Sequence, residues 1–146
     1  MSRQGKKVYA ASEEETQELA QKLAARVHRG AVITLQGTLG AGKTTFVRAF
    51  VEALGGTPAQ VSSPTFSIIH YYDAPIPVAH ADAYRLESEP EAIQAGIEEL
   101  FDGNQIVLIE WPEHIRNLIP EPVIEIEIQC LGESEREFRV AGLEDF

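Results

Sequence analysis

The sequence has a single cysteine and no long apolar run. Cys130 alone excludes a disulfide within the chain, and there is no cluster of Cys and His at zinc-ligand spacing. A membrane-spanning helix needs about 20 consecutive apolar residues, and no stretch approaches that length. The polar segment Met1–Lys7 is followed by no apolar stretch like that of a signal peptide. We therefore expect a cytosolic protein that makes no membrane contact, in which Cys130 packs within a strand.

Positive charge is scarce as well. Twelve Lys and Arg stand against 23 Asp and Glu, which gives a formal net charge of −11. Binding to the phosphate backbone of a nucleic acid depends on cationic contacts, so this balance opposes unaided binding to RNA or DNA. If a nucleic acid is involved in the function, we expect a partner to hold it.

The length and apolar content suit one compact domain. With 146 residues, 44% of them hydrophobic, the chain can build an ordinary core without disulfides or a structural metal. The sequence contains no internal repeat, linker or low-complexity segment. We therefore expect a single domain over residues 1–146.

Two continuous apolar runs predict strands that are buried on both faces. Ala31–Gln36 and Gln105–Ile109 are rich in β-branched residues and lack the polar alternation of a half-exposed strand. Such strands are typical of a largely parallel sheet. Lys43–Leu54 carries apolar residues at helical spacing and stops at Gly55-Gly56, so a strand, a glycine-rich loop and a helix follow one another.

Flanking helices and hairpins complete the predicted elements. Ser12, followed by three glutamates, predicts a capped helix start, and the helix should run to about His28, with Gly30 as its C-terminal glycine. Antiparallel hairpins are expected from Phe66–Asp73 with Val78–Asp82 and from Val123–Gln129 with Phe138–Val140. The other predicted elements are a first strand, Lys6–Ala11, short helices over Pro90–Phe101 with a break near Gly96, and a brief helix over His114–Leu118.

The glycine-rich loop has the pattern of a phosphate-binding loop. Residues 37–44 read GTLGAGKT and fit G-x-x-x-x-G-K-[ST], in which backbone N–H groups and the start of the following helix surround a phosphate. Lys43 would neutralise the β- and γ-phosphates, Thr44 would place its hydroxyl on Mg²⁺, and Thr45 would reach the α-phosphate. The predicted nucleotide-binding residues of this loop are Gly37, Leu39, Gly40, Ala41, Gly42, Lys43, Thr44 and Thr45. We therefore predict an α/β fold with three layers of the P-loop NTPase kind, with a mostly parallel central sheet and antiparallel hairpins.

Nucleotide hydrolysis also needs an acidic residue at the end of a neighbouring strand. Glu110 directly follows an apolar strand and is the Mg²⁺-side candidate; the alternative is a solvated carboxylate at a strand end. Asp82 is a second candidate for the Mg²⁺ side, since it shares a strand face with His80. The sequence leaves open whether His80 is catalytic or orients its neighbours by packing and hydrogen bonding.

Two further features have more than one reading. Residues 62–65, SSPT, are rich in hydroxyls and fit either a segment that moves with the state of the γ-phosphate or a simple turn. Trp111 fits either the core or an anchor that faces a partner.

The combination of GTLGAGKTT, SSPTF, HADAYRL and IEWPE, in this order and over nearly the whole chain, resembles the bacterial TsaE (YjeE) family. The resemblance implies the ATPase component of tRNA threonylcarbamoyladenosine synthesis, which uses ATP and Mg²⁺. It implies TsaD and TsaB as protein partners, with tRNA reached only through their complex.

The resemblance also assigns roles to single residues. It places Lys43 and Thr44 on phosphate and Mg²⁺, Glu110 on Mg²⁺, and Asp82 at the catalytic centre. The N-terminal segment of the family approaches the base, which makes Ser12 and Thr16 weaker nucleotide-binding candidates. Whether Arg136 or Arg139 touches the nucleotide stays open.

Three other functions are compatible with a strand, a glycine-rich loop and a helix. A small-molecule kinase would need an acceptor pocket and an arginine-bearing lid, and few arginines follow Trp111. A regulatory module would bind nucleotide only to change its affinity for a partner. A GTPase is disfavoured because no N-K-x-D string is present. If the chain is an ATPase, we expect slow hydrolysis without partners, because it has no obvious arginine finger.

Overall fold

The computed structural model describes residues 5–37, 42–57, 68–143 and 146. The strands are β1 (Lys6–Ala10), β2 (Val32–Gln36), β3 (Ile69–Tyr72), β4 (Val78–Asp82), β5 (Ile106–Glu110), β6 (Ile124–Cys130) and β7 (Arg136–Ala141). The helices are α1 (Glu13–Ala24), α2 (Lys43–Ala53), α3 (Glu89–Gln94) and the 3₁₀ helices η2 (Ala83–Arg85), η3 (Ile97–Leu100) and η4 (Pro112–Leu118). This order agrees with the elements that the sequence predicts.

The strands form one mixed sheet of seven strands in the order β1-β7-β6-β2-β5-β4-β3. The four central strands β6, β2, β5 and β4 run parallel, and antiparallel pairs add β7 and β1 at one side and β3 at the other. The prediction of a mostly parallel centre with antiparallel hairpins is confirmed. Parallel strands end at the same edge of a sheet, so the ends of β2, β4 and β5 bring the predicted site residues to one place.

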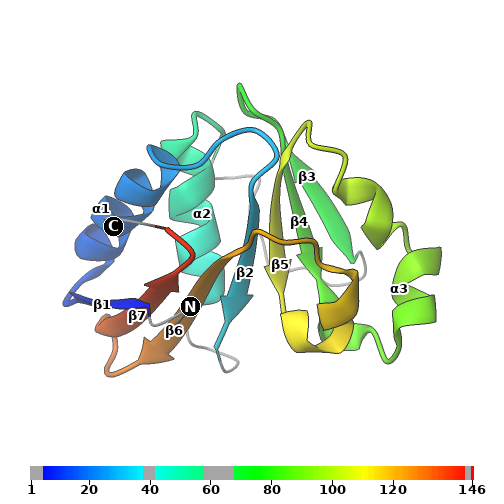
Figure 1. The fold of residues 1–146 in the computed structure, drawn as a ribbon. Coiled ribbons are helices and arrows are strands. Elements are labelled where there is room, and N and C mark those ends of the chain that lie inside the picture. The colour runs from blue at the N-terminus through cyan, green and yellow to red at the C-terminus, as the bar shows by residue number, and fades with distance from the viewer. Residues whose placement is uncertain (1–4, 38–41, 58–67, 144–145) are drawn as a thin grey trace.

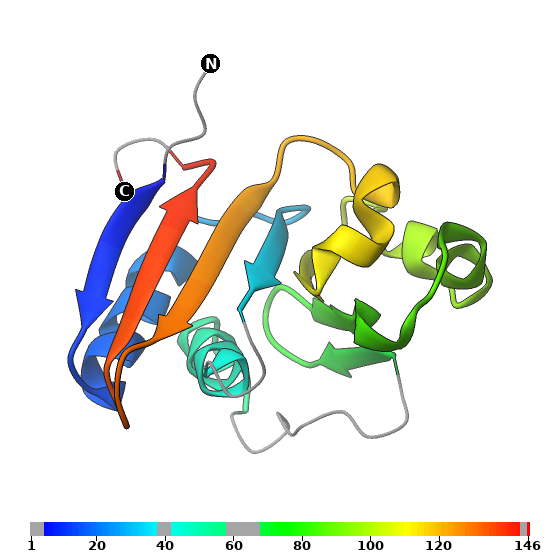
Figure 2. The ribbon, with the colours of Figure 1, turned by 90° about the horizontal axis from the view of Figure 1, so that it is seen from below.

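Helices cover the sheet on both faces, which makes three layers (Figures 1 and 2). Helices α1 and α2 lie on one face, and α3 with its neighbouring 3₁₀ helices lies on the other. The side chains of β5 alternate between the two cores: Ile106 and Leu108 pack with the α1 and α2 side, and Val107 and Ile109 with the α3 side. Because strand side chains alternate, Glu110 falls on the α2 face. Among the described residues, no helix is both long and apolar enough to cross a membrane.

Helix α1 ends earlier than the sequence predicts. Its cap is Ser12, as expected, but it ends at Ala24 rather than near His28. The chain turns instead, with the Ala31 N–H donating to the His28 carbonyl and the Gly30 N–H donating to the carbonyl of Gln105. Gly30 has a φ of 93° in the connection to β2, so its glycine signal belongs to this connection and not to the helix end.

The prediction that Cys130 packs within the protein is wrong. Cys130 is a free, exposed thiol, and its Sγ donates to the carbonyl of Gly132 at 3.2 Å. It is the last residue of β6, which places it after the buried Ile126 and Ile128, at the point where the strand passes into the turn to β7. The alternation of apolar residues along β6 continues to Cys130, but this residue lies beyond the core that buries Ile126 and Ile128.

Candidate nucleotide-binding site

Helix α2 begins without a capping side chain in the described part of the chain. Its N-cap is Gly42, whose φ of 102° and ψ of 18° lie in the left-handed region, and the first turn contains no acidic residue. A Cβ on Gly42 would lie 2.8 Å from Nε of Arg136, so both the backbone conformation and the space favour glycine. Thr44 and Thr45 are partly buried in the first turn. The N–H groups and positive end of the helix are therefore available to an anion.

The Lys43 side chain is enclosed at the start of this helix. Its Nζ donates to the carbonyl of Gly37 at 2.8 Å and lies 4.0 Å from Oε1 of Glu110. The same ammonium lies 4.0 Å from the centroid of the Trp111 ring. Only 6% of the residue is exposed. One cation is thus held between a carbonyl oxygen, a carboxylate and an aromatic face, next to the glycine-rich loop.

Burial lowers the pKa of Lys43 below its ordinary value. The carboxylates of Glu110, Asp82 and Glu113, in that order, partly offset this shift. Because desolvation is the largest cause, the charged form of Lys43 is less favourable in the protein than in water. A phosphate bound beside Nζ would supply the negative charge that these carboxylates supply only in part.

Glu110 ends β5 as a buried carboxylate, so the alternative of a solvated strand-end residue is wrong. Its Oε2 lies 2.5 Å from Nε2 of His80, and Nδ1 of the same imidazole lies 3.4 Å from the Tyr72 hydroxyl. Burial raises the pKa of Tyr72, and the charge of Glu110 adds to that rise. Of the two readings of His80, the structure supports a histidine that is hydrogen-bonded to its neighbours.

Asp82 lies opposite Glu110 in the register of β4 and β5. Its Oδ1 accepts a hydrogen bond from the Tyr84 N–H at 3.0 Å, which caps η2. Its negative charge nevertheless acts on Lys43 and partly offsets the lowering of the Lys43 pKa by burial. The sheet edge therefore brings Asp82, Glu110 and Lys43 together, as the sequence predicts.

Trp111 belongs to the site, a role that sequence reasoning did not assign. It directly follows Glu110 with a φ of 59°, a left-handed conformation that turns the chain into η4. The indole is partly buried between Lys43 and Tyr84, with 4.9 Å between the centroids of the Trp111 and Tyr84 rings. The only signal in the sequence is the position of an aromatic residue directly after the acidic strand end.

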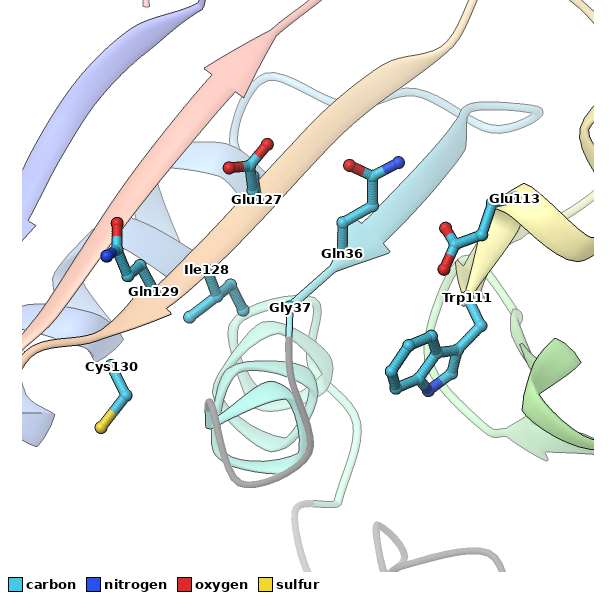
Figure 3. A pocket seen from close by; sticks show the side chains of 8 residues that line it. All are labelled: Gln36, Gly37, Trp111, Glu113, Glu127, Ile128, Gln129 and Cys130. Carbon is cyan, nitrogen blue, oxygen red and sulfur yellow. The ribbon is translucent and has the colours of Figure 1, made fainter.

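A large hollow of about 730 Å³ opens beside the start of the glycine-rich loop (Figure 3). It lies between the end of β2, the end of β6 and the segment after β5, and it is lined by Gln36, Gly37, Trp111, Glu113, Glu127, Ile128, Gln129 and Cys130. Glu113 and Glu127 stand on opposite sides of it. The carboxylates of Glu113 and Glu127 make this hollow unfavourable for a phosphate without a bound cation.

A smaller hollow lies at the other side of the α2 start. It is lined by Glu13, Thr16, Gly42, Thr45, Ser134, Arg136 and Phe138. This arrangement brings Thr16 and Thr45 to the same small hollow, and the nucleotide-binding role of Thr16 stays a prediction. The Ser12 hydroxyl accepts instead from the Glu15 N–H at 3.2 Å and caps α1.

Arg136 and Arg139 lie on different faces of β7. Arg136 shares the face of buried Phe138 and stands against Gly42. Its guanidinium donates to the carbonyls of Gly132 and Glu135, both at 2.9 Å, which holds it beside the loop. Arg139 falls on the opposite face by strand alternation. No motif in the sequence separates these two arginines.

The remaining predicted residues of the glycine-rich loop, Leu39, Gly40 and Ala41, lie outside the described residues, as do residues 62–65. Within the described ranges, no group of three His, Cys, Asp or Glu side chains could hold a metal alone. Thr44, Asp82 and Glu110 nevertheless offer hard oxygen donors of the kind that Mg²⁺ takes. Mg²⁺ bound with nucleotide phosphates needs only one or two protein carboxylates, so this donor set fits it.

The chain is similar to proteins of one family. A family model described as threonylcarbamoyl adenosine biosynthesis protein TsaE matches residues 10–138. The tRNA threonylcarbamoyladenosine biosynthesis protein TsaE of Bacillus subtilis is 45% identical over 125 residues, which cover 85% of this chain and 77% of that protein. The protein of the same description from Aquifex aeolicus is 39% identical over 137 residues, which cover 92% of this chain and 95% of that protein.

A solved structure has the same fold. The crystal structure of YdiB from Bacillus subtilis matches with a TM-score of 0.74 and 35% sequence identity, over 97% of this chain and 90% of that one. The family match at residues 10–138 contains the site residues from Ser12 to Arg136.

Proposed function

Because this chain belongs to the TsaE family of threonylcarbamoyladenosine biosynthesis proteins, we propose that it binds ATP with Mg²⁺, hydrolyses it, and acts on a complex of TsaD and TsaB. The observation that carries the proposal is the buried ammonium of Lys43 at the start of α2, 4.0 Å from the Glu110 carboxylate. A cation and an acidic strand end beside a glycine-rich loop are the components that phosphoryl transfer from ATP requires.

Each residue has a distinct task in this proposal. The N–H groups at the start of α2 and the Lys43 ammonium bind the β- and γ-phosphates. Thr44, Glu110 and Asp82 would hold Mg²⁺, which supplies positive charge to the phosphates when it is bound. Phosphate binding beside Nζ would also stabilise the charged form of Lys43, which burial disfavours.

The nucleoside would lie toward the N-terminal segment. Thr16, Thr45 and Arg136 line one hollow that adjoins Gly42, and Ser12 lies one turn before Thr16 at the start of α1. Together with the loop residues Gly37, Leu39, Gly40, Ala41, Gly42, Lys43 and Thr44, they make the proposed nucleotide-binding set.

Partners enter the proposal because the described contacts of Lys43 and Glu110 include no arginine. Arg136 is the arginine beside the loop, and carbonyls of the β6–β7 turn hold its guanidinium. Charge stabilisation is the main source of rate in phosphoryl transfer, so the isolated protein should turn over slowly. A complex of TsaD and TsaB would supply the missing group or order the site, and tRNA would be reached through it.

Phosphate release tests the proposal. It should be measured for the protein alone and with TsaD and TsaB, in the wild type and in Lys43→Ala and Glu110→Gln. We expect stimulation by the pair, and a loss of about 100-fold or more in each variant, as for removal of a charge-stabilising group. Lys7→Ala and Glu52→Ala, at exposed positions on β1 and α2, are the matched controls and should keep the wild-type rate. Transfer of phosphate to a small acceptor would support a kinase instead, and binding to the pair without turnover would support a regulatory module.

A further inference from the structure

We infer that His80 and Tyr72 are positioning residues, which fix the Glu110 carboxylate so that one of its oxygens faces Lys43 and the phosphate-binding loop. This inference rests on the proposed function, and it adds two residues to the site that have no direct contact with the phosphates or Mg²⁺. It gives the histidine of the HADAYRL segment a specific task.

The three side chains come from three adjacent strands. Tyr72 lies on β3, His80 on β4 and Glu110 on β5. They are 3%, 2% and 6% exposed, so water does not compete strongly for their polar atoms. The distances are 3.4 Å from the Tyr72 hydroxyl to Nδ1 of His80 and 2.5 Å from Nε2 of His80 to Oε2 of Glu110. The hydrogen bonds therefore form one chain that ends on a single carboxylate oxygen.

The short bond decides how the carboxylate is oriented. The terminal torsion of a glutamate is broad, so packing alone leaves the plane of its two oxygens poorly defined. The bond from His80 Nε2 holds Oε2, and Oε1 is then the oxygen directed toward Lys43, at 4.0 Å. Lys43 is too distant for a hydrogen bond to Oε1, so His80 is the group that sets the orientation.

Tyr72 has a supporting place in this chain. When Nε2 of a neutral imidazole donates to Glu110, Nδ1 is left as an acceptor for the Tyr72 hydroxyl. The two rings also lie against each other, with 6.1 Å between their centroids. Tyr72 therefore favours the tautomer and the ring orientation that His80 needs. Outer partners of this kind are known to govern metal-binding carboxylates and histidines, and their loss costs about 10- to 100-fold in metal affinity or activity.

The test is the Mg²⁺ dependence of nucleotide binding, measured with a non-hydrolysable ATP analogue as the probe. His80→Phe keeps an aromatic ring and removes Nε2, and His80→Gln places an amide nitrogen near the position of Nε2. Tyr72→Phe removes the hydroxyl, and Tyr71→Phe is its matched control, because Tyr71 is the preceding residue of β3 and is 66% exposed. For each variant we would measure the apparent Kd of Mg²⁺ in the presence of the analogue, and the Kd of the analogue in EDTA.

We expect His80→Phe to weaken Mg²⁺ binding about 10- to 100-fold while the Kd in EDTA stays near that of the wild type. His80→Gln should restore most of the affinity, Tyr72→Phe should show a smaller loss in the same direction, and Tyr71→Phe should show none. If His80→Phe does not fold, as judged by its thermal unfolding, the comparison of His80→Gln and Tyr72→Phe with Tyr71→Phe carries the test.

Unchanged Mg²⁺ dependence in His80→Phe would overturn the inference and leave the proposed function standing. An equal loss of affinity with and without Mg²⁺ would also overturn it, because it would mean that His80 only supports the scaffold. If the wild type bound the analogue without any dependence on Mg²⁺, both the proposed Mg²⁺ site and the inference would fail.

Discussion

The ammonium of Lys43 lies over the indole of Trp111, with Nζ 4.0 Å from the ring centroid, and Trp111 is the only tryptophan of the chain. A phosphate beside Nζ changes the charge next to this ring, so the intrinsic fluorescence of the protein should change when MgATP binds. Lys43→Met should abolish the change. The measurement is a fluorescence titration with MgATP. An equal signal from Lys43→Met would show that the ring does not sense this cation.

Burial of Lys43 makes a second prediction, on stability against pH. The pKa of Lys43 lies below its ordinary value of 10.5 in the folded protein, chiefly because of desolvation. Between the lowered pKa and 10.5, the unfolded chain therefore holds more protons than the folded one, and stability rises with pH. Relative to Lys43→Met, the free energy of unfolding of the wild type should increase across this range.

Urea unfolding at a series of pH values up to 10.5 checks this linkage. Taking the difference from Lys43→Met removes the contributions of the other titrating groups, including Tyr72, whose pKa is raised by burial. A constant difference across the whole range would contradict the prediction.

Most of the fold could be predicted because its signals are local. The two buried parallel strands are continuous apolar runs, and the helix after the loop has both an apolar face and a glycine stop. Where the end of an element depends on distant packing, the local signal was insufficient. Helix α1 ends at Ala24 and the chain turns so that Gly30 meets Gln105; Gly30 indicates a turn, but not that the helix ends six residues earlier.

The site shows the same limit. Lys43, Asp82 and Glu110 could be placed from a motif and from strand ends, since chain position alone brings them to one edge. Three other contacts depend on the packing of separate elements. They are those of Trp111 with Lys43, of His80 with Glu110, and of Arg136 with Gly42. The sequence places Trp111 directly after Glu110 and His80 on the strand face of Asp82, but it does not specify which side chains they contact.

A third prediction separates backbone strain from crowding at the loop. Gly42 and Gly103 both have positive φ, 102° and 83°, but a Cβ on Gly42 would meet Arg136 at 2.8 Å, whereas one on Gly103 would meet nothing within 4 Å. Gly103→Ala should lose about 1 to 2 kcal/mol of stability from the left-handed conformation and keep its nucleotide affinity. Gly42→Ala should also weaken nucleotide binding, because Arg136 or the start of α2 must move. Chemical unfolding and a binding titration on both variants check this, and equal affinities would contradict it.

A fourth prediction concerns Ser12, whose hydroxyl caps α1 by accepting from the Glu15 N–H at 3.2 Å. Ser12→Ala should lose about 1 kcal/mol in the free energy of unfolding, as other capping residues do when replaced by alanine. Ser12→Asp should keep the stability, because aspartate accepts the same bond and favours the positive end of a helix. Ser12→Ala with wild-type stability in urea unfolding would mean that the cap contributes nothing to the fold.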